Sequence, residues 1–376
     1  VVADETEKLL TSKKNNYNHK KIERHLDYIE GKTNEYLSRL DENDEDESPE
    51  KVQAVVEKIE RLKKNKIRYE LLSEKLAASG EPQISTTDED ARALLVQGQV
   101  VEVSYNMQAA VDDKYKLVVA THTINRNDRN ALSRIAIEAK ENLQAKNLIV
   151  LSDKGYHNGR ELQECRNNNI NTICAQQEIV KSNDEGTTPE CLGTNFTDNK
   201  DTDTYTCPEG HTLNTTGTWH TKYRDNNNYQ FKKYRTSACK ACPVKHLCTG
   251  RTKGGREIDR SEFAGAVEEN GVRYKNKQEL YRKRQEINEH IFGTIKRKWG
   301  YNHTNLKGLE KVNGEFALIM TVYNMKRCMN ILGFENLLKK LAKWKPDYKR
   351  IAGTLFFRPH FIKLERSSFS DIKIAA

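Results

Sequence analysis

Three acidic residues in this chain stand where carboxylates can do chemistry. Asp112 and Asp153 each follow an apolar run typical of a β-strand, and Glu289 lies inside a strongly basic segment predicted to be helical. Carboxylates on rigid elements can hold two divalent cations about 3.5–4 Å apart and so support phosphoryl transfer. Mg²⁺ prefers such hard oxygen ligands, and Mn²⁺ accepts them as well.

Each acid taken alone also has a simpler explanation. Asp112 begins a hairpin turn, where aspartate is a common turn residue. Glu289 could form an ordinary helical ion pair, and Glu286 competes with it for any role. Asp153 is more suggestive, because Gly155 follows closely and a glycine lets other backbone approach.

The basic segment predicts a polyanionic partner. Residues 272–298 carry nine Lys or Arg against three Glu, within a chain of net charge +9. We expect the partner to be double-stranded DNA. Tyr281, Arg284 and Lys296 are candidates to steady phosphates, and Lys296 shares a helical face with Glu289. Further candidate DNA contacts are Arg282, Lys283, Arg297, Lys298 and Trp299, although a core or lid position suits Trp299 better.

Four of the eight cysteines show the spacing C…C-x2-C-x5-C, which is typical of a structural zinc site. In a reducing compartment this spacing favours Zn²⁺ over disulfides. The ion would stabilise a segment too polar to build its own core. His211 or His246 could replace one cysteine, and four free thiols are the alternative. The four candidate ligands are Cys207, Cys239, Cys242 and Cys248, whereas Cys191 has no assigned role.

The sequence divides into five segments. Residues 1–82 predict a charged helical arm, with two helices joined by an acidic linker. Residues 83–176 and 266–333 predict the two parts of an α/β domain. Between them lies a polar, Cys-rich insertion, 177–265. A basic tail, 334–376, completes the chain.

The α/β domain is predicted from alternating and apolar patterns. A hairpin, a helix, a short buried strand, a second helix and another strand follow one another, which indicates a mixed sheet flanked by helices. Two long helices then complete the domain. The predicted ranges are 100–111 and 115–124 for the hairpin, then 127–142, 148–151, 158–167, 171–175, 274–298 and 309–332.

Composition limits the location and the size class. With 376 residues, 36% hydrophobic and 31% charged, the chain predicts two or three domains with at least one core. No run approaches the roughly 18 apolar residues of a membrane helix, and no secretory pattern opens the chain. We expect a cytoplasmic, nucleoid-associated protein without a membrane partner. Because the chain begins Val-Val, we expect a fragment or a processed chain.

Several blocks together resemble the DDE transposases of bacterial insertion sequences, in the group with a Y-R-E-K pattern and a Cys-containing insertion. The blocks are SYNMQAAVDDKYKLVVA, LSDKGYHNG, YRKRQEINEHIFGTIKRKWGYNH and TVYNMKR. The resemblance covers most of 83–333. It implies a ribonuclease-H-like fold, with Mg²⁺ or Mn²⁺ held by Asp112, Asp153 and Glu289.

The same resemblance carries over the tyrosine, arginine and lysine of the pattern to Tyr281, Arg284 and Lys296. Four residues separate Arg284 from Glu289, where the family pattern has three, so Glu286 stays an alternative third acid. The family also carries an N-terminal DNA-recognition domain that nothing in this chain resembles. It implies a homodimer acting on the element ends and on target DNA.

We therefore expect a DDE transposase that cuts DNA and transfers strands. Two other hypotheses remain open. One is a decayed or repurposed DNA-binding protein without catalysis, and the other is a metal-dependent nuclease of the same fold without a joining step.

Overall fold

The computed structural model describes residues 2–8, 13–42, 49–96, 100–176, 188–223 and 228–344. The chain forms two compact units, Val1–Asn324 and Met325–Ala376, and each is described by itself. The first contains a four-stranded antiparallel sheet and a separate parallel pair of strands in place of the single mixed sheet predicted, together with helices, a helical arm and a Cys-rich module. No described helix is both long enough and apolar enough to cross a membrane.

The central sheet is built on one long strand, β5 (Val100–Val111). β4 (Arg92–Val96) and β6 (Val118–Ile124) both pair with it antiparallel, so the expected hairpin forms. β7 (Leu148–Ser152) and β8 (Ile170–Cys174) make a separate parallel pair. Their short apolar sequences are typical of buried strands.

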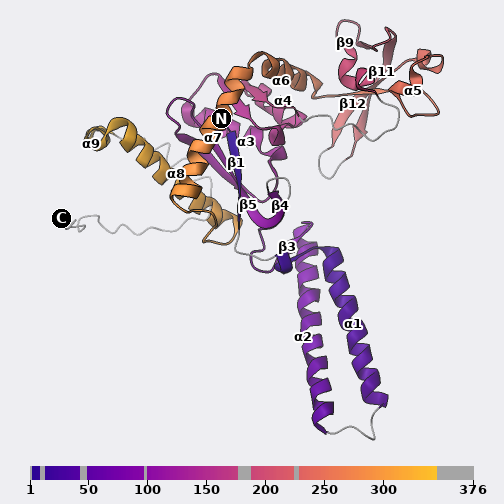
Figure 1. Cartoon of the computed structure of the whole chain (residues 1–376), viewed down its shortest axis with the longest axis vertical. Helices are drawn as coiled ribbons and strands as arrows, with labels where there is room; N and C mark the ends of the chain where they lie inside the picture. Colours follow the sequence, from indigo (N-terminus) through magenta and orange to yellow (C-terminus); the bar gives the residue numbers. More distant parts are fainter. Residues whose placement is uncertain are drawn as a thin grey trace. The chain divides into compact units, whose positions relative to one another are not determined.

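A strand from the beginning of the chain joins this sheet. β1 (Val2–Lys8) pairs antiparallel with β5, from Val2 opposite Ala110 to Lys8 opposite Ser104. β1 lies beside β5 (Figure 1). It also contacts β7. The sequence pattern had grouped these residues with the arm, because a seven-residue polar strand has no local signal for its distant partner.

Two hydrophobic cores lie on opposite faces of β5, because successive side chains of a strand alternate. Val103, Tyr105, Met107 and Ala109 face the first core. Helices α7 (Gln278–Gly293) and α8 (Leu309–Leu332) cover it with a set of buried side chains. That set is Ile287, Ile291, Phe292, Val312, Phe316, Met320 and Tyr323.

The second core is covered by α3 (Leu132–Leu143), α4 (Gly159–Asn167) and α6 (Ala264–Asn276). A 3-10 turn, Asp128–Asn130, precedes α3, so the helix predicted from residue 127 begins five residues later, at Leu132. The predicted helix 274–298 is two helices, α6 and α7, followed by a π-helical turn, Thr294–Lys298. π turns inside or next to α-helices are frequently found at functional sites.

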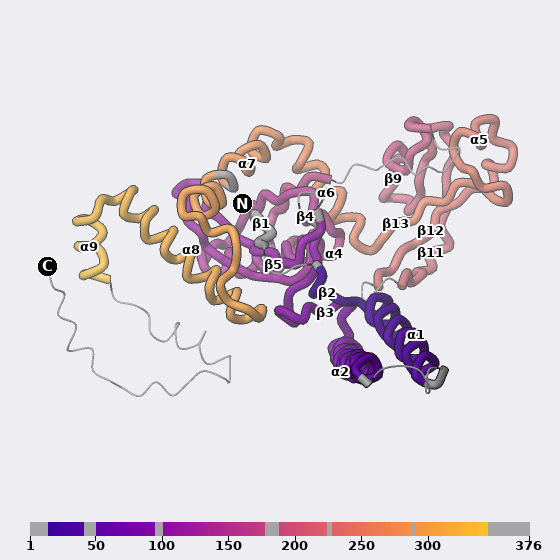
Figure 2. The backbone as a smooth tube through the Cα atoms, turned by 60° about the horizontal axis from the view of Figure 1, so that its bottom comes forward, coloured from indigo at the N-terminus to yellow at the C-terminus, as the bar shows by residue number. Residues whose placement is uncertain are grey.

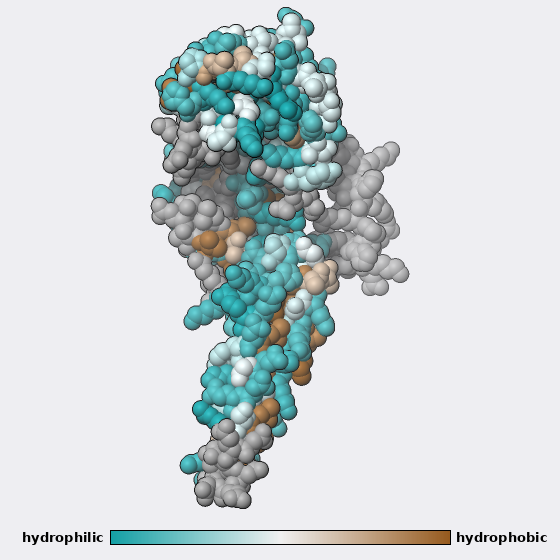
Figure 3. Space-filling model, turned by 90° about the vertical axis from the view of Figure 1, so that its right-hand side faces the viewer, coloured by the Kyte–Doolittle hydropathy of each residue, from teal (hydrophilic) through white to brown (hydrophobic). Residues whose placement is uncertain are grey.

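The arm consists of α1 (His19–Glu42) and α2 (Pro49–Ser79), which lie side by side (Figure 2). A small core at its base joins the helices to the two-stranded pair β2 (Asn16–Tyr17) and β3 (Ile84–Ser85). Further along, apolar side chains form a strip on the face seen in Figure 3. Exposed apolar side chains of these helices include Leu37, Val56 and Ile67.

The Cys-rich module, residues 188–261, is a five-stranded antiparallel sheet in the order β13-β12-β11-β10-β9. Its buried core is small, consisting of Phe196, Tyr205, Leu213 and Tyr234. The strands are β9 (Thr197–Asn199), β10 (Thr204–Thr206), β11 (Thr212–Lys222), β12 (Tyr229–Arg235) and β13 (Ile258–Ser261). One short helix, α5 (Lys245–Cys248), carries the last cysteine of the spacing pattern.

α8 ends where the sequence predicts, because Gly333 follows with a φ of 75°. Glycine adopts this left-handed conformation without steric cost. α9 (Phe334–Lys343) belongs to the second unit, and the remainder of the predicted basic tail lies outside the described residues.

Candidate active site

Asp153 stands directly after β7, at the carboxyl end of the strand. It caps a 3-10 turn, Lys154–Tyr156, with its Oδ1 accepting from the Gly155 amide at 3.4 Å. The Cys174 thiol at the end of β8 donates to the Asp153 carbonyl at 3.0 Å. The turn is therefore fixed to both parallel strands, while the Asp153 side chain stays 42% exposed. A ligand could reach this carboxylate.

Helix α7 brings a cation to Asp153. Arg284 Nη1 lies 3.5 Å from Asp153 Oδ2, and the guanidinium sits 5.4 Å from the centre of the Tyr281 ring. Burial raises the pKa of Tyr281, against the opposing effect of Arg284. The phenol therefore stays protonated near neutral pH and can donate a hydrogen bond.

A buried polar network supports the Asp153 turn. It lies on the face of β5 opposite the first core. Gln108 on β5 donates to Asp128 Oδ1 at 3.1 Å and accepts from the Tyr156 hydroxyl. Asn106 also donates to Asp128, whose carboxylate lies against Gly155. Gln108 and Tyr156 are fully buried. Our reading of the sequence missed this network, although two amides at alternating positions of an apolar strand were a signal for it.

Asp112 serves its own turn in this structure. Its Oδ2 accepts from the Tyr115 amide at 2.6 Å, and its backbone closes the hairpin with Leu117. Because a strand rises about 3.3 Å per residue, Asp112 lies roughly 13 Å along β5 from Gln108, which contacts the Asp153 turn. The described hydrogen bonds of Asp112 lie within its own hairpin.

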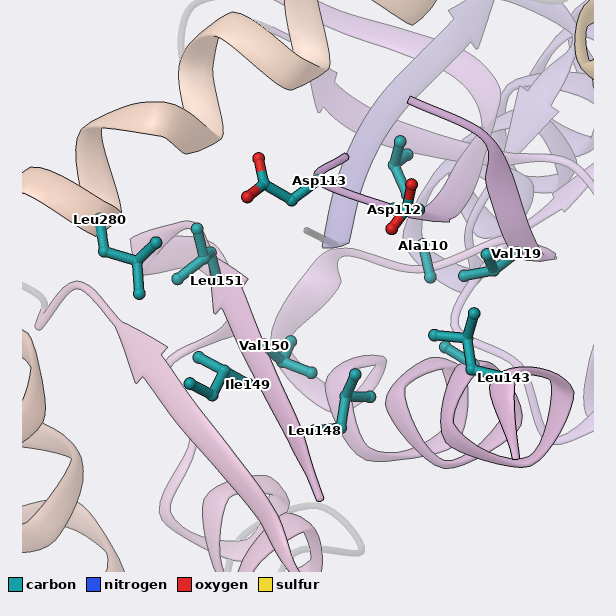
Figure 4. Close-up of a pocket in the computed structure, with 12 residues that line it drawn as sticks. Ala110, Asp112, Asp113, Val119, Leu143, Leu148, Ile149, Val150, Leu151 and Leu280 are labelled. Carbon is teal, nitrogen blue, oxygen red and sulfur yellow. The ribbon is translucent and has the colours of Figure 1, made fainter. Parts of the chain in front are cut away.

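Asp112 and Asp113 instead line a cavity of about 280 Å³. Figure 4 shows this cavity with Leu148 to Leu151 of β7 along it and Leu280 of α7 at one side. Most lining side chains are apolar. The arrangement fits a gap in the packing beneath the hairpin better than a phosphate site.

For the third predicted acid, Glu289, the structure describes only the backbone. Glu289 lies in α7, but its side chain is outside the described residues. Glu286, the alternative, is exposed. Lys296 lies in the π-helical turn. A π turn has more residues per turn than an α-helix, so Lys296 and Glu289 are not two whole α-helical turns apart, as the sequence prediction assumed.

The remaining predicted DNA contacts divide into two groups. Arg282, Lys283, Arg297 and Lys298 are exposed on α7 and on the π-helical turn. Trp299 is half-buried against the first core, with its ring 6.4 Å from that of Tyr323. This position favours the packing role for Trp299 over base stacking.

β1 adds an acid that our reading of the sequence did not consider. The backbone register places Asp4 opposite Gln108, and β1 contacts β7. The side chains of β1 are outside the described residues. Nothing in the local sequence distinguished Asp4 from other charged residues of the predicted arm.

The structure shows no preformed metal site in the part of the chain whose side chains are described. There, no three His, Cys, Asp or Glu side chains are arranged to hold a metal ion. That part does not include the side chains of β1 or of Glu289. The half-exposed Asp153 carboxylate, with one cation beside it, offers the hard oxygens that Mg²⁺ prefers.

The fold and this site define an α/β protein with an acidic strand end facing a basic helix. A family model described as a transposase DDE domain matches residues 206–329. The match includes the C-x2-C segment, α6, α7 and most of α8, whereas Asp112 and Asp153 precede it. It confirms the resemblance to DDE transposases. No curated protein and no solved structure matches the chain.

Proposed function

We propose that this protein is a metal-dependent DDE transposase that cleaves DNA and transfers the strand of an insertion sequence. The observation that carries the proposal is the pairing of Asp153 with Arg284. It joins the strand-end acid, which precedes the family match, to the basic helix, which lies inside it. The four-stranded sheet, the parallel pair and their helices would then form a ribonuclease-H-like domain, interrupted by the Cys-rich module.

The side chains would act as follows. Asp153, Glu289 and a further aspartate would hold two Mg²⁺ or Mn²⁺ ions, which when bound stabilise the attacking and leaving oxygens. Without metal, the Arg284 guanidinium forms an ion pair with the Asp153 carboxylate. With metal bound, Arg284 would instead contact phosphate oxygens. Protonated Tyr281 and Lys296 would position the same phosphate, and the exposed cations of α7 would hold the flanking DNA.

Two residues compete for the place of the first aspartate. Asp112 is the residue that the family resemblance selects, and its carboxylate caps a turn. Asp4 lies on β1, which contacts β7, and faces Gln108 in the register of the sheet. Because carboxylates must share ions about 3.5–4 Å apart, only the aspartate that reaches Asp153 can serve.

The test is metal-dependent nicking of supercoiled DNA by the full chain. We expect Asp153→Ala to abolish nicking with Mg²⁺ or Mn²⁺ while DNA binding survives. Asp201→Ala, in an exposed turn of the Cys-rich module, is the matched control and should nick normally. Parallel Asp4→Asn and Asp112→Asn variants assign the first aspartate. Retained nicking by Asp153→Ala would refute the site.

The two rival functions give different results in the same experiment. A metal-dependent nuclease would nick DNA but yield no strand-transfer product from a pre-cut end. A DNA-binding protein without catalysis would bind DNA and leave it uncut with every metal. Joined products between an element end and target DNA support the transposase alone.

Three further properties belong to this proposal. The protein would act as a homodimer on paired DNA ends, which sedimentation with and without DNA measures. It would be cytoplasmic and nucleoid-associated. The Cys-rich module would bind a structural Zn²⁺ through Cys207, Cys239, Cys242 and Cys248, because its buried core is too small to stabilise it alone.

A further inference from the structure

Five of the eight cysteines line one pocket in the Cys-rich module. The spacing pattern accounts for four of them, and Cys191 is the fifth. The pocket has a volume of about 20 Å³ and is completed by apolar side chains such as Phe196 and Leu213. This volume holds one water molecule or one small ion, because a single water needs about 10–15 Å³ by this measure.

Backbone hydrogen bonds bring Cys191 to this pocket. The Thr188 amide donates to the Leu247 carbonyl at 2.8 Å, and the Cys191 amide donates to the Thr188 carbonyl at 3.0 Å. Leu247 directly precedes Cys248 in α5. The buried Cys191 thiol consequently meets the Cys248 thiol in a hydrogen bond.

The other thiols are also held by their local structure. At Cys207 the chain turns through Gly210, which has a φ of 80°, and the His211 amide donates to the Cys207 sulfur at 3.3 Å. A hydrogen bond from a backbone amide to a cysteine sulfur stabilises the thiolate form of that cysteine. Gly255 packs on Cys239 so closely that an added Cβ would lie 2.4 Å from the Cys239 Cβ.

Arg256, a cation, also lines this pocket. Its Nε is buried without a hydrogen-bond partner among the described residues. A buried guanidinium nitrogen with no acceptor is costly. A divalent ion held by four thiolates has a net charge of −2, so Arg256 would stabilise the occupied site.

We propose that Cys191 is a metal ligand of the Cys-rich module, where it joins Cys239, Cys248 and one of Cys207 and Cys242 around a single Zn²⁺ ion. Thiolate ligands in tetrahedral number select zinc or iron–sulfur centres. The small pocket suits a single ion better than a cluster of several iron and sulfur atoms. The thiols are not yet grouped for a metal, so they draw together by side-chain rotation on binding.

This inference deepens the zinc site proposed above and is independent of DNA cleavage. The full chain is purified in reducing buffer, and zinc per chain is measured by elemental analysis. Zinc affinity follows from competition with a chromogenic chelator. Cobalt substitution then reports the ligands, because thiolate-to-cobalt charge transfer scales with the number of bound thiolates.

Cys191→Ser is the test variant, and Cys165→Ser is the matched control, because Cys165 is equally buried but lies in α4. We expect about one zinc per wild-type chain. Cys191→Ser should lose about tenfold or more in zinc affinity. Its charge-transfer band should fall by about a quarter, as one of four thiolates is lost. Cys165→Ser should match the wild type.

Three results would overturn the inference. The first is a Cys191→Ser protein with the affinity and cobalt spectrum of Cys165→Ser. The second is a wild-type protein that binds neither zinc nor cobalt. The third is a Cys191–Cys248 disulfide, found by mass spectrometry of protein alkylated at purification. None of these readouts depends on nicking, so they leave the proposed transposase activity to its own test.

Discussion

Asn270 on α6 holds the end of β8 beside the candidate site, and its removal gives the sharpest test of this fold. The side chain is fully buried. Its Oδ1 accepts from the Cys174 amide at 2.9 Å, and its Nδ2 donates to the Cys174 carbonyl at 2.9 Å. The Asn270 side-chain amide thus makes the hydrogen bonds that a neighbouring strand would make on the side of Cys174 that no described strand pairs with.

Replacing Asn270 with Leu keeps a similar volume but removes both hydrogen bonds. The amide and the carbonyl of Cys174 are then buried without partners. Each unsatisfied buried group costs about 1–3 kcal/mol, so we expect a loss of roughly 2–6 kcal/mol in the free energy of opening this region. The lower value corresponds to roughly 30-fold faster exchange of the protected amides.

Asn324 on α8 provides the matched control. It makes the same pair of hydrogen bonds to Val118 on β6, at 2.8 and 2.7 Å, but it is only half-buried. Water reaches this position more readily than it reaches the fully buried Asn270. Asn324→Leu should therefore cost less than Asn270→Leu, although the two changes are chemically identical.

The assay is hydrogen exchange followed by mass spectrometry, which reads β8 and β6 separately and needs no two-state unfolding of the whole chain. Asn270→Leu should accelerate exchange at the end of β8. Equal effects of the two variants on their own strands, or unchanged exchange in β8, would show that burial does not set the cost.

Two further predictions concern other buried groups. Tyr156→Phe leaves the Gln108 carbonyl without its donor and should cost about 1–3 kcal/mol in urea unfolding, with loss of nicking from a loosened Asp153 turn; unchanged stability would contradict the network. Burial, with a smaller effect of Arg134, lowers the pKa of His122 from 6.5 to about 4. The unfolded chain then binds more protons between these values, so His122 costs stability as pH falls from 6.5 towards 4. His122→Gln should weaken this pH dependence, whereas His19→Gln, at an exposed position, should not.

The sequence by itself determined the elements whose signals are local. The alternation in 100–111 and the apolar run 148–151 predicted β5 and β7, and helical spacing with Gly333 as a stop predicted α8. It also identified Asp153 and Arg284 as candidates. Short-range periodicity and capping suffice for such features, because their energetics lie within neighbouring residues.

Only the tertiary structure decided which distant residues meet. The pairing of β1 with β5, the contact of Arg284 with Asp153 and the entry of Cys191 into the thiol pocket each join segments far apart in the chain. No local pattern encodes these partners, because the same polar strand or thiol would suit many environments. They are selected by burial and hydrogen bonding when the whole chain packs.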